Sequence, residues 1–337
     1  MKILVTGGLG FIGSETVISL IENGYEVVIV DNLANSKIGV LDRIETITGV
    51  RPDFVKVDCC DKEALNQVFD AYPVSGVIHF AGLKAVGESV RIPLAYYRNN
   101  LLSTINLVEA MAAHNVYNLV FSSSATVYGD PKELPLLETT PLGETTNPYG
   151  ETKKMIERIL TDFNKANPEF NIALLRYFNP IGGHKSGLLG EDPTGIPNNL
   201  LPYVTQVAIG RRDKLHVYGN DYPTEDGTCI RDYIHVCDLA EGHVATIKYL
   251  EEKPGLVIFN LGTGKGTSVF GVLKAFEEAT GVKIPYQVDP RRPGDVTANY
   301  ANVDKAEKIL HWKAKRDVKQ ACFDAYQFQV KNPKGIE

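Results

Sequence analysis

Tyr149 and Lys153 have the spacing of an acid–base pair. They form a Tyr-x-x-x-Lys sequence directly after Asn147-Pro148, a typical helix start, so both side chains share one face of the predicted helix. A phenol with a pKa of about 10 is only about 0.1% ionised at pH 7. A lysine ammonium and any further cation nearby favour the phenolate. Such a tyrosine could take the proton of a substrate hydroxyl.

The same spacing occurs twice more, but without supporting context. Residues 128–132 enclose Gly-Asp-Pro, which predicts a turn, and residues 249–253 end a predicted helix far from any nucleotide motif. Only Tyr149 and Lys153 open a predicted helix within the nucleotide-binding half of the chain. They also follow a serine run that ends a predicted strand, and its last member, Ser124, could hydrogen-bond the reacting oxygen. We therefore predict Tyr149, Lys153 and Ser124 as the catalytic residues.

A glycine loop near the N-terminus predicts a dinucleotide site. Gly7, Gly10 and Gly13 lie between a predicted strand and a predicted helix, where backbone N–H groups and the helix N-terminus can hold a pyrophosphate. Asp31 ends the next predicted strand, 18 residues after Gly13. A carboxylate there accepts hydrogen bonds from ribose hydroxyls and repels a 2′-phosphate, so NAD is preferred over NADP.

The elements that position these residues alternate between strand and helix. Apolar, β-branched runs predict strands at residues 3–6, 27–31, 54–57, 76–80, 119–122 and 172–176, and helical patterns lie between them, as at 13–23 and 104–114. This alternation predicts an α/β fold with a doubly wound parallel sheet.

The composition of the chain changes after about residue 180, where glycines and prolines become frequent. We expect a Rossmann NAD-binding domain at residues 1–180 and a smaller α/β substrate domain at 181–337. Segments of the second range could return to the first domain. Asp58 and the segment Phe80-Ala-Gly-Leu-Lys84 follow two strands of the first domain. They therefore lie at the carboxyl edge of the sheet, where ligands bind in such folds.

Composition and charge exclude several classes of protein. With 337 residues, 44% of them hydrophobic, the chain can bury the core of one large α/β domain or two coupled ones. The net charge of −6 argues against nucleic acid as a partner. No apolar run reaches the ~18 residues of a membrane span. After Lys2 the chain runs into Ile-Leu-Val and the glycine loop, so we expect no signal peptide.

Cysteines and histidines indicate a cytoplasmic protein without a protein-held metal. The five cysteines are odd in number, two are adjacent, and none forms Cys-x-x-Cys, which argues against a disulfide framework. The seven histidines lack the spacing of zinc ligands.

Longer stretches reveal a family resemblance that spans nearly the whole chain. The glycine loop, the residues Ser124, Tyr149 and Lys153, and runs such as Ser122-Ser-Ser-Ala-Thr-Val-Tyr-Gly129 resemble the extended short-chain dehydrogenase/reductase superfamily, and within it the UDP-hexose 4-epimerase family. Further resembling stretches lie at residues 79–89, 175–180, 190–193, 196–202, 219–228 and 231–235.

This resemblance implies a set of ligand contacts. The implied NAD contacts, beside the glycines and the catalytic residues, are Phe11, Ile12, Asp31, Asn32, Leu33, Ala34, Asn35, Ser36, Asp58, Cys59, Phe80, Ala81, Gly82, Leu83, Lys84, Asn99 and Phe178. The implied UDP-sugar contacts are Ser124, Tyr149, Asn179, Asn199, His216, Val217, Tyr218, Arg231, Arg292 to Asp295, and Asn299. Two arginines can grip a diphosphate bidentately, and Asp295 can accept from uridine ribose hydroxyls.

The resemblance also implies an activity. It implies reversible C4 epimerisation of UDP-glucose and UDP-galactose through a 4-keto sugar, with Tyr149 as the base and NAD retained throughout. Because the nicotinamide returns the hydride that it takes, no net oxidation results. The family further implies a homodimer, and helices near residues 101–113 and 153–163 are the candidate contacts.

Three residues depart from the family pattern. Phe11 replaces a tyrosine in the glycine loop, and Glu15 replaces a histidine in the first helix, where we expect its charge to face away from the pyrophosphate. Asn299 stands where a bulky tyrosine goes with rejection of N-acetylated sugars. Since Asn is smaller, we hypothesise additional activity on UDP-N-acetylglucosamine and UDP-N-acetylgalactosamine. The alternative is that Tyr300 fills the same space.

Other functions on the same fold remain open. A 4,6-dehydratase needs an Asp-Glu pair just after the catalytic Ser or Thr, and a decarboxylase typically carries a Glu there. Ala125 and Thr126 occupy those positions and cannot shuttle a proton at neutral pH, which favours epimerisation. A dehydrogenase that releases NADH is a further alternative, and a non-catalytic NAD-sensing protein would not need Tyr149 and Lys153.

Overall fold

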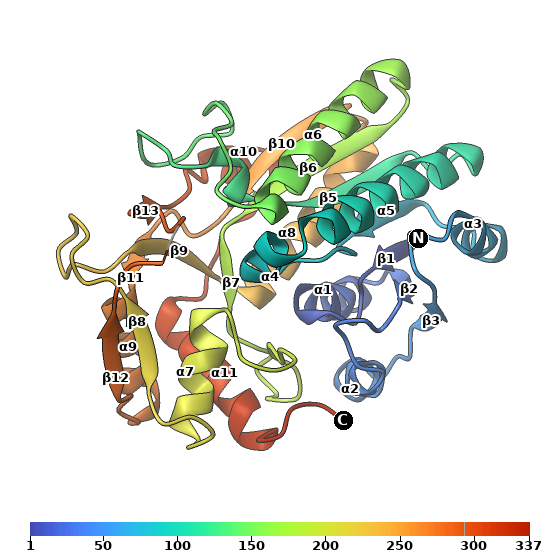
Figure 1. Cartoon of the computed structure of the whole chain (residues 1–337). Helices are drawn as coiled ribbons and strands as arrows, with labels where there is room; N and C mark the ends of the chain where they lie inside the picture. The colour runs from blue at the N-terminus through green and yellow to red at the C-terminus, as the bar shows by residue number, and fades with distance from the viewer. Residues whose placement is uncertain (293) are drawn as a thin grey trace.

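A seven-stranded parallel sheet forms the centre of the computed structural model, which describes residues 1–292 and 294–337 (Figure 1). Its strand order is β3-β2-β1-β4-β5-β6-β10, which confirms the predicted doubly wound α/β fold. The strands are β1 (Lys2–Thr6), β2 (Glu26–Asp31), β3 (Asp53–Lys56), β4 (Gly76–His79), β5 (Asn118–Ser124), β6 (Asn171–Tyr177) and β10 (Leu256–Leu261).

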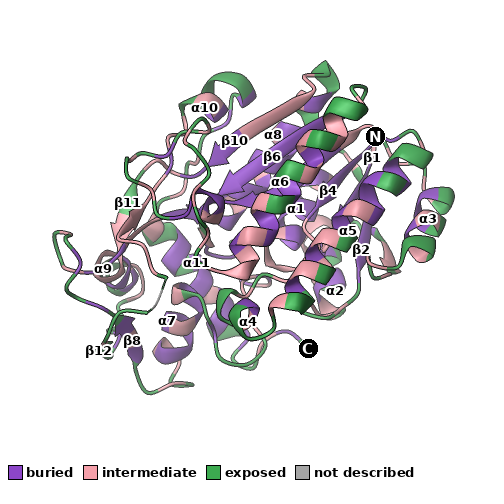
Figure 2. Ribbon diagram, turned by 45° about the horizontal axis from the view of Figure 1, so that its top comes forward, coloured by how far each residue is buried: buried purple, intermediate pink, exposed green. Residues whose placement is uncertain are grey.

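Helices cover both faces of this sheet, so its strands are apolar on both sides. Ile3 and Val5 of β1 pack on one face, while Leu4 packs on the other. The strands of the central sheet are accordingly coloured as largely buried in Figure 2. The first face carries α1 (Phe11–Glu22), α2 (Gly39–Thr48), α8 (Val236–Tyr249) and α10 (Asp304–Leu310). The second carries α3 (Lys62–Ala71), α5 (Pro93–Ala113) and α6 (Pro148–Ala166), and the short helix α4 (Val86–Arg91) precedes α5.

The C-terminal half adds smaller sheets and a separate core at the lower left of Figure 1. Val204, Phe276 and Ala321 form part of that core, one from each of three helices. The helices are α7 (Leu200–Ala208), α9 (Val269–Thr280) and α11 (Val318–Lys331). The strands are β7 (Asn179–Ile181), β9 (Ile230–His235), β11 (Gly266–Ser268) and β13 (Ala298–Asn299) in one sheet, and β8 (Leu215–Tyr218) with β12 (Tyr286–Asp289) in another. None of the helices in the described part of the chain is long and apolar enough to cross a membrane.

The two halves share a core because the chain crosses back. Strand β10 pairs in parallel with β6, and α8 packs against α1. Phe259 of β10 is 0% exposed and lies in the same cluster as Ile3, Val5 and the single tryptophan, Trp312. Residues beyond 180 therefore complete the sheet that carries the glycine loop.

We predict that Phe259→Ala destabilises both halves together. Truncating this buried ring should lower the free energy of unfolding by about 3 to 5 kcal/mol. Urea unfolding followed by circular dichroism and by Trp312 fluorescence should give one coincident transition for wild type and variant. Phe323→Ala removes an exposed ring of α11 and should cost less than about 1 kcal/mol. Two separate transitions would contradict a shared core.

Candidate active site

The site begins where β5 ends and α6 starts. Asn147 caps α6, since its Oδ1 accepts a hydrogen bond from the N–H of Gly150 at 2.9 Å, and Pro148 occupies the first turn. Tyr149 and Lys153 therefore stand on the first two turns of α6, on one face. Neither alternative pair has this geometry. Residues 128–132 leave a 3₁₀ turn, and Lys253 lies beyond α8 with a φ of 57°.

Lys153 is a buried cation that lies beside Tyr149. Its Nζ donates to the carbonyl oxygen of Ser122 at 2.7 Å and lies 5.9 Å from the centre of the Tyr149 ring. Burial lowers the pKa of Lys153 to about 8, and the charge of Glu157, one turn further along α6, partly opposes that shift. The ammonium is thus fixed in place without a direct ion pair to Glu157.

Each member of the serine run at the end of β5 has a different partner. Ser122 holds Lys153 through its carbonyl and exchanges a hydrogen bond with the Tyr177 hydroxyl. The Ser123 hydroxyl donates to Glu157 at 2.5 Å. Ser124 accepts from the N–H of Thr126 at 3.2 Å and from its hydroxyl at 3.0 Å. Since strand residues alternate in direction, Ser122 and Ser124 share a side of the strand.

A buried ion pair behind Lys153 was not predicted. Arg176 of β6 donates to Glu157 through Nε at 2.9 Å and through a terminal nitrogen at 2.6 Å, and both side chains are 4% exposed. Arg176 also donates to the Tyr128 hydroxyl, which in turn donates to Asn260 of β10. The one signal in the sequence was that Glu157 continues the face of Tyr149 and Lys153 by a further four residues.

The environment of Tyr149 favours the neutral phenol when no ligand is present. Burial raises its pKa, and the neighbouring Ser124 hydroxyl opposes that rise. Ionisation at neutral pH therefore depends on positive charge supplied by Lys153 and by a bound cationic ring.

The glycine loop fits a dinucleotide. A Cβ on Gly13 would overlap the carbonyl oxygen of Gly7, and Gly7 has a φ of 69°. Asp31 joins this loop to the end of β2, because its Oδ2 accepts from the N–H of Leu9 at 3.1 Å and its Oδ1 from the N–H of Leu33 at 2.9 Å. The glycine loop, the start of α1 and the Asp31 carboxylate thus lie close together. The loop and the helix start suit a pyrophosphate, and the carboxylate suits an adenosine ribose.

The other predicted cofactor residues lie along the same edge. Phe11 and Ile12 open α1, Asn32 to Ser36 follow β2, Cys59 follows Asp58, Phe80 to Lys84 follow β4, Asn99 lies on α5 and Phe178 follows β6. The Asp58 carboxylate accepts hydrogen bonds from the Asn32 side chain at 3.0 Å and from the N–H of Cys60 at 2.8 Å. Burial alone would raise the pKa of Asp58, but these hydrogen bonds lower it.

Asn100 is a residue of this edge that sequence reasoning missed. Its Oδ1 accepts from the N–H of Leu83 at 2.8 Å, and its Nδ2 donates to the Leu83 carbonyl and to the hydroxyl of Thr152, both at 3.0 Å. Asn100 is 2% exposed. It therefore connects the loop after β4 to α6, which carries Tyr149 and Lys153.

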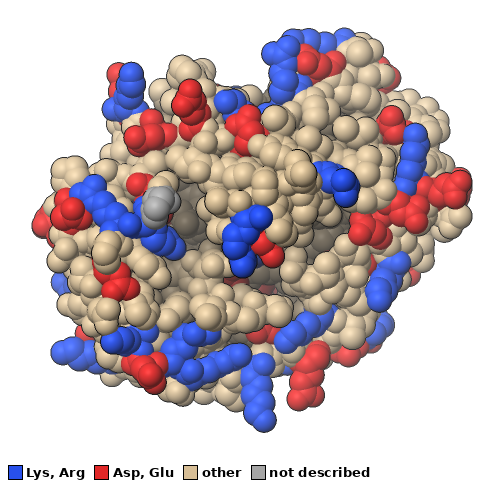
Figure 3. All heavy atoms as spheres, viewed as in Figure 1, with Lys and Arg blue, Asp and Glu red and all other residues tan. Residues whose placement is uncertain are grey.

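The predicted phosphate-binding residues come together in the C-terminal half. Asp295 lies between two guanidinium groups, 3.8 Å from Arg231 and 3.0 Å from Nε of Arg292, and Arg292 covers the Tyr218 ring at 4.8 Å. Pro293, within the predicted segment, lies outside the described residues. Two cations against one carboxylate leave positive charge for a diphosphate. Figure 3 shows the surface hollowed between the two halves, with Lys and Arg side chains beside the hollow.

Other predicted substrate residues have polar partners of their own. His216 of β8 shares a hydrogen bond with Asp289 at 2.6 Å, and Val217 is buried on the same strand. Asn199 donates to Glu191 at 2.6 Å, and the ammonium of Lys84 lies 3.7 Å from the same carboxylate. Burial raises the pKa of Glu191. Glu191 lies in a stretch that resembles the family, yet it was not predicted as a contact.

Two strands that flank β9 carry the remaining residues. Asn179 of β7 pairs with Tyr233, and Asn299 of β13 pairs with Arg231. The Oδ1 atom of Asn299 is buried and has no hydrogen-bond partner in residues 1–292 and 294–337. Tyr300, the next residue, packs its ring beside Gly266 of β11. Asn299 is therefore a neighbour of the predicted phosphate site, while Tyr300 is directed at another strand.

Comparison with known proteins identifies relatives over the full length. The family model described as GDP-mannose 4,6 dehydratase matches residues 4–324. A UDP-glucose 4-epimerase of Yersinia pestis is 54% identical over 335 residues, 99% of each chain. The human UDP-glucose 4-epimerase is 54% identical over 99% of this chain and 98% of its own. The crystal structure of UDP-glucose 4-epimerase from Bifidobacterium longum in complex with NAD+ and UDP superimposes with a TM-score of 0.97 at 54% identity, covering 99% of this chain and 100% of that one.

We predict that Lys153→Met stabilises the protein at pH 7. Burial lowers the Lys153 pKa from 10.5 to about 8, so the unfolded chain holds this proton more tightly. The cost to stability is present in full below pH 8 and disappears as pH rises to 10.5. After loss of the bond to Ser122, the variant should gain about 2 kcal/mol at pH 7 and less than about 1 kcal/mol at pH 10. Urea unfolding at both pH values measures this difference.

A matched control is Lys165→Met, which removes an exposed ammonium near the other end of α6. It should change stability by less than about 0.5 kcal/mol at either pH. A Lys153→Met variant that is less stable than wild type at pH 7 would show that Lys153 is not held at a cost.

Proposed function

This chain belongs to the UDP-glucose 4-epimerase family, and we propose that Tyr149, Lys153 and Ser124 carry out the proton transfers of its reaction. As a member of that family it is an NAD-dependent isomerase that interconverts UDP-glucose and UDP-galactose. The observation that supports this assignment best is the buried ammonium of Lys153, held by the Ser122 carbonyl beside the Tyr149 ring.

Tyr149 acts as the base in this proposal. Bound NAD supplies a reversible acceptor for the hydrogen on C4 of the hexose. The Tyr149 phenolate takes the proton of the 4-hydroxyl and returns it after the resulting 4-keto sugar has turned its other face. Lys153 stabilises the phenolate, and Ser124 hydrogen-bonds the reacting oxygen. Since C4 is oxidised and then reduced, the same NAD can stay bound.

In this proposal the UDP part of the substrate is bound tightly and anchors the whole molecule. Arg231 and Arg292 hold the diphosphate, Asp295 accepts from the uridine ribose, and Asn199 and Tyr218 complete the contacts. The hexose must turn during the reaction, so it is held less tightly than the nucleotide. Binding energy far from C4 then supports the chemistry without fixing the sugar.

The residues after Ser124 favour epimerisation over dehydration, although the matching family model carries a dehydratase description. Ala125 is buried and has no acid–base group. The Thr126 hydroxyl donates to Ser124 at 3.0 Å and does not ionise at neutral pH. An elimination of water needs an acid and a base at these two positions, so a 4,6-dehydratase or decarboxylase is disfavoured.

Asn299 supports a wider range of substrates. It lies on β13 next to Arg231, and its Oδ1 has no hydrogen-bond partner in the part of the chain that the structure describes. Tyr300 is directed toward Gly266 instead of filling the same space. A free amide oxygen can accept from the N–H of an acetamido group. We propose that UDP-N-acetylglucosamine and UDP-N-acetylgalactosamine are also substrates.

We extend the proposal to the domain boundaries, the oligomeric state and the cellular location of the protein. Residues 1–180 form the NAD-binding domain and 181–337 the UDP-sugar domain, with α8 and β10 contributed back to the first. The protein forms a homodimer through α5 and α6, which is supported by exposed apolar side chains there and on α4, such as Val90, Leu94 and Met155. It works in the cytoplasm, which its five free cysteines support.

We predict that Tyr149→Phe lowers kcat at least about a hundredfold, because it removes the proton acceptor. The affinity for UDP should stay within about twofold, since UDP contacts other residues. The assay follows conversion of UDP-galactose with no NAD added, and calorimetry measures UDP binding. Tyr249→Phe is the matched control, because it has the same Tyr-x-x-x-Lys spacing outside the site. A Tyr149→Phe enzyme with near-normal kcat would refute the assignment, and net NADH formation by wild type would indicate a dehydrogenase.

We predict that Asn299→Tyr narrows the substrate range. The larger ring should reduce kcat/KM for UDP-N-acetylglucosamine at least about tenfold while that for UDP-galactose changes about threefold or less. Parallel assays of wild type and variant with both sugars measure the ratio. A wild-type enzyme that is active on UDP-galactose but inactive on both acetylated sugars would show the substrate proposal to be wrong.

A further inference from the structure

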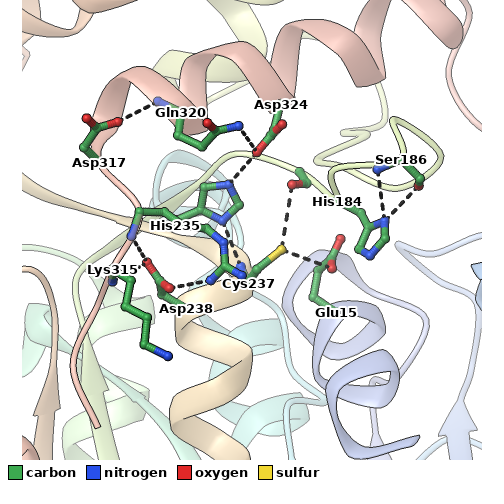
Figure 4. Close-up of polar contacts among 12 residues, drawn as sticks. Glu15, His184, Ser186, His235, Cys237, Asp238, Lys315, Asp317, Gln320 and Asp324 are labelled. Carbon is green, nitrogen blue, oxygen red and sulfur yellow. Dashed lines mark hydrogen bonds and ion pairs between the residues drawn. The ribbon is translucent and has the colours of Figure 1, made fainter. Parts of the chain in front are cut away.

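A second cavity lies between α1 and α8, and no residue predicted to bind NAD or UDP-sugar lines it. Its volume is about 760 Å³, which is the size of a small-molecule site. Ile18, Val244 and Leu310 give it apolar walls, and Glu15, His184 and Asp324 bring polar groups from α1, the loop after β7 and α11. Figure 4 shows these polar residues gathered around the start of α8.

Glu15 is the group in this cavity with unused bonding capacity. Its side chain points toward Cys237 on α8 (Figure 4). The residue is 3% exposed. Among the described residues its Oε1 has no hydrogen-bond partner, and its Oε2 accepts only from a thiol, at 3.6 Å. Burying a carboxyl with so few partners costs stability, and nothing in the proposed reaction uses it.

The neighbouring polar groups are already paired. Asp324 accepts from His235 at 3.1 Å and from Gln320 at 3.0 Å. Arg316 is held by Asp238 and Glu241. The structure therefore leaves Glu15, among these groups, to a ligand.

These residues do not form a nucleophilic site. His235 accepts from the backbone N–H of Cys237, not from its thiol. Burial, followed by the charge of Glu15, raises the pKa of the Cys237 thiol far above neutrality. Binding, not covalent chemistry, is what this cluster can support.

The charge of the cavity favours a cation. Six carboxyl side chains line it against three lysine and arginine side chains, so acidic groups outnumber basic ones even while Glu15 is neutral. Glu22, Glu251 and Glu252 are exposed, so they place negative charge where the cavity meets solvent. A small cation is attracted to such an opening.

We propose that this cavity binds an alkylammonium ion, with the ammonium at Glu15 and the aliphatic chain against Ile18 and Val244. An amine on a short carbon chain matches both the carboxyl and the apolar walls. Inorganic cations make no apolar contacts with the walls, and anions are repelled by the carboxylates. The site is separate from the epimerase reaction and does not depend on its assignment.

Binding is linked to pH through Glu15. Burial raises its pKa to about 8, so the carboxyl is mostly neutral at pH 7 and mostly ionised at pH 9. Cys237, Arg316, Asp324 and Glu22 act on it electrostatically. The Cys237 pKa stays far above this range, burial lowers the pKa of His184 below 6.5, and His235 is hydrogen-bonded to Asp324. Since the ammonium needs the ionised carboxylate, affinity should rise with pH.

The test is calorimetric titration of the NAD-bound enzyme with n-butylammonium chloride at pH 7 and pH 9. Like lysine, the probe stays protonated at both values. The dissociation constant should be about tenfold lower at pH 9, following the ionised fraction of Glu15. Titration with n-butanol, which has the same chain without charge, should give no binding.

Two variants locate the site. Glu15→Gln keeps the shape of the side chain and should weaken butylammonium binding at pH 9 at least about tenfold and abolish its pH dependence. Glu22→Gln removes one charge at the opening and should change the dissociation constant about twofold or less. Both variants should keep wild-type epimerase activity, which also confirms that they fold.

Three outcomes would overturn the proposal. They are no measurable heat with the wild type at pH 9, an affinity that does not change between pH 7 and pH 9, and unchanged binding in Glu15→Gln. The pH comparison uses the wild type alone, so it holds even if Glu15→Gln fails to fold.

Discussion

The site depends on keeping one ammonium group buried beside one phenol. Lys153 has little access to water, and burial lowers its pKa to about 8. Three features offset that cost. The Ser122 carbonyl accepts a hydrogen bond from the ammonium, the Phe121 ring faces it at 4.8 Å, and the charge of Glu157 acts from the next helical turn. A buried ammonium is stabilised strongly by a nearby negative charge, because little water screens the two groups. For the same reason Lys153 can favour ionisation of Tyr149 to the phenolate.

Glu157 can act on Lys153 because it is itself held by Arg176 and Ser123. This ion pair connects α6 to β6, and Tyr128 and Asn260 extend it to β10. A chain of buried polar contacts thus runs from α6 to a strand supplied by the C-terminal half. Such a network is stabilising only when each member is satisfied, so the position of Lys153 depends on residues more than 100 positions later in the sequence.

Much of the fold, and the residues that meet in the candidate site, could be predicted from the sequence, because the signals there are local. The glycine loop, Asp31 at a strand end and the Tyr149–Lys153 spacing each depend on a few neighbouring residues. Asn100, Arg176 and Glu191 could not be found in this way, because their roles arise from contacts between elements far apart in sequence. The cavity beside Glu15 likewise exists only once α1 and α8 are packed together. Strand β10 carries an apolar pattern that predicts a strand but not which sheet it joins.

The crossing of the chain between its halves has a consequence for how ligands are exchanged. The polypeptide leaves the first half after β6, returns for α8 and β10, leaves again for α9, and returns for α10. Two bodies joined through so many connections and one shared core cannot swing apart about a single hinge. Entry of a nucleotide sugar and release of its epimer must then occur through local rearrangement of loops and side chains around a rigid frame. That rigidity also suits a cofactor that stays bound through many turnovers.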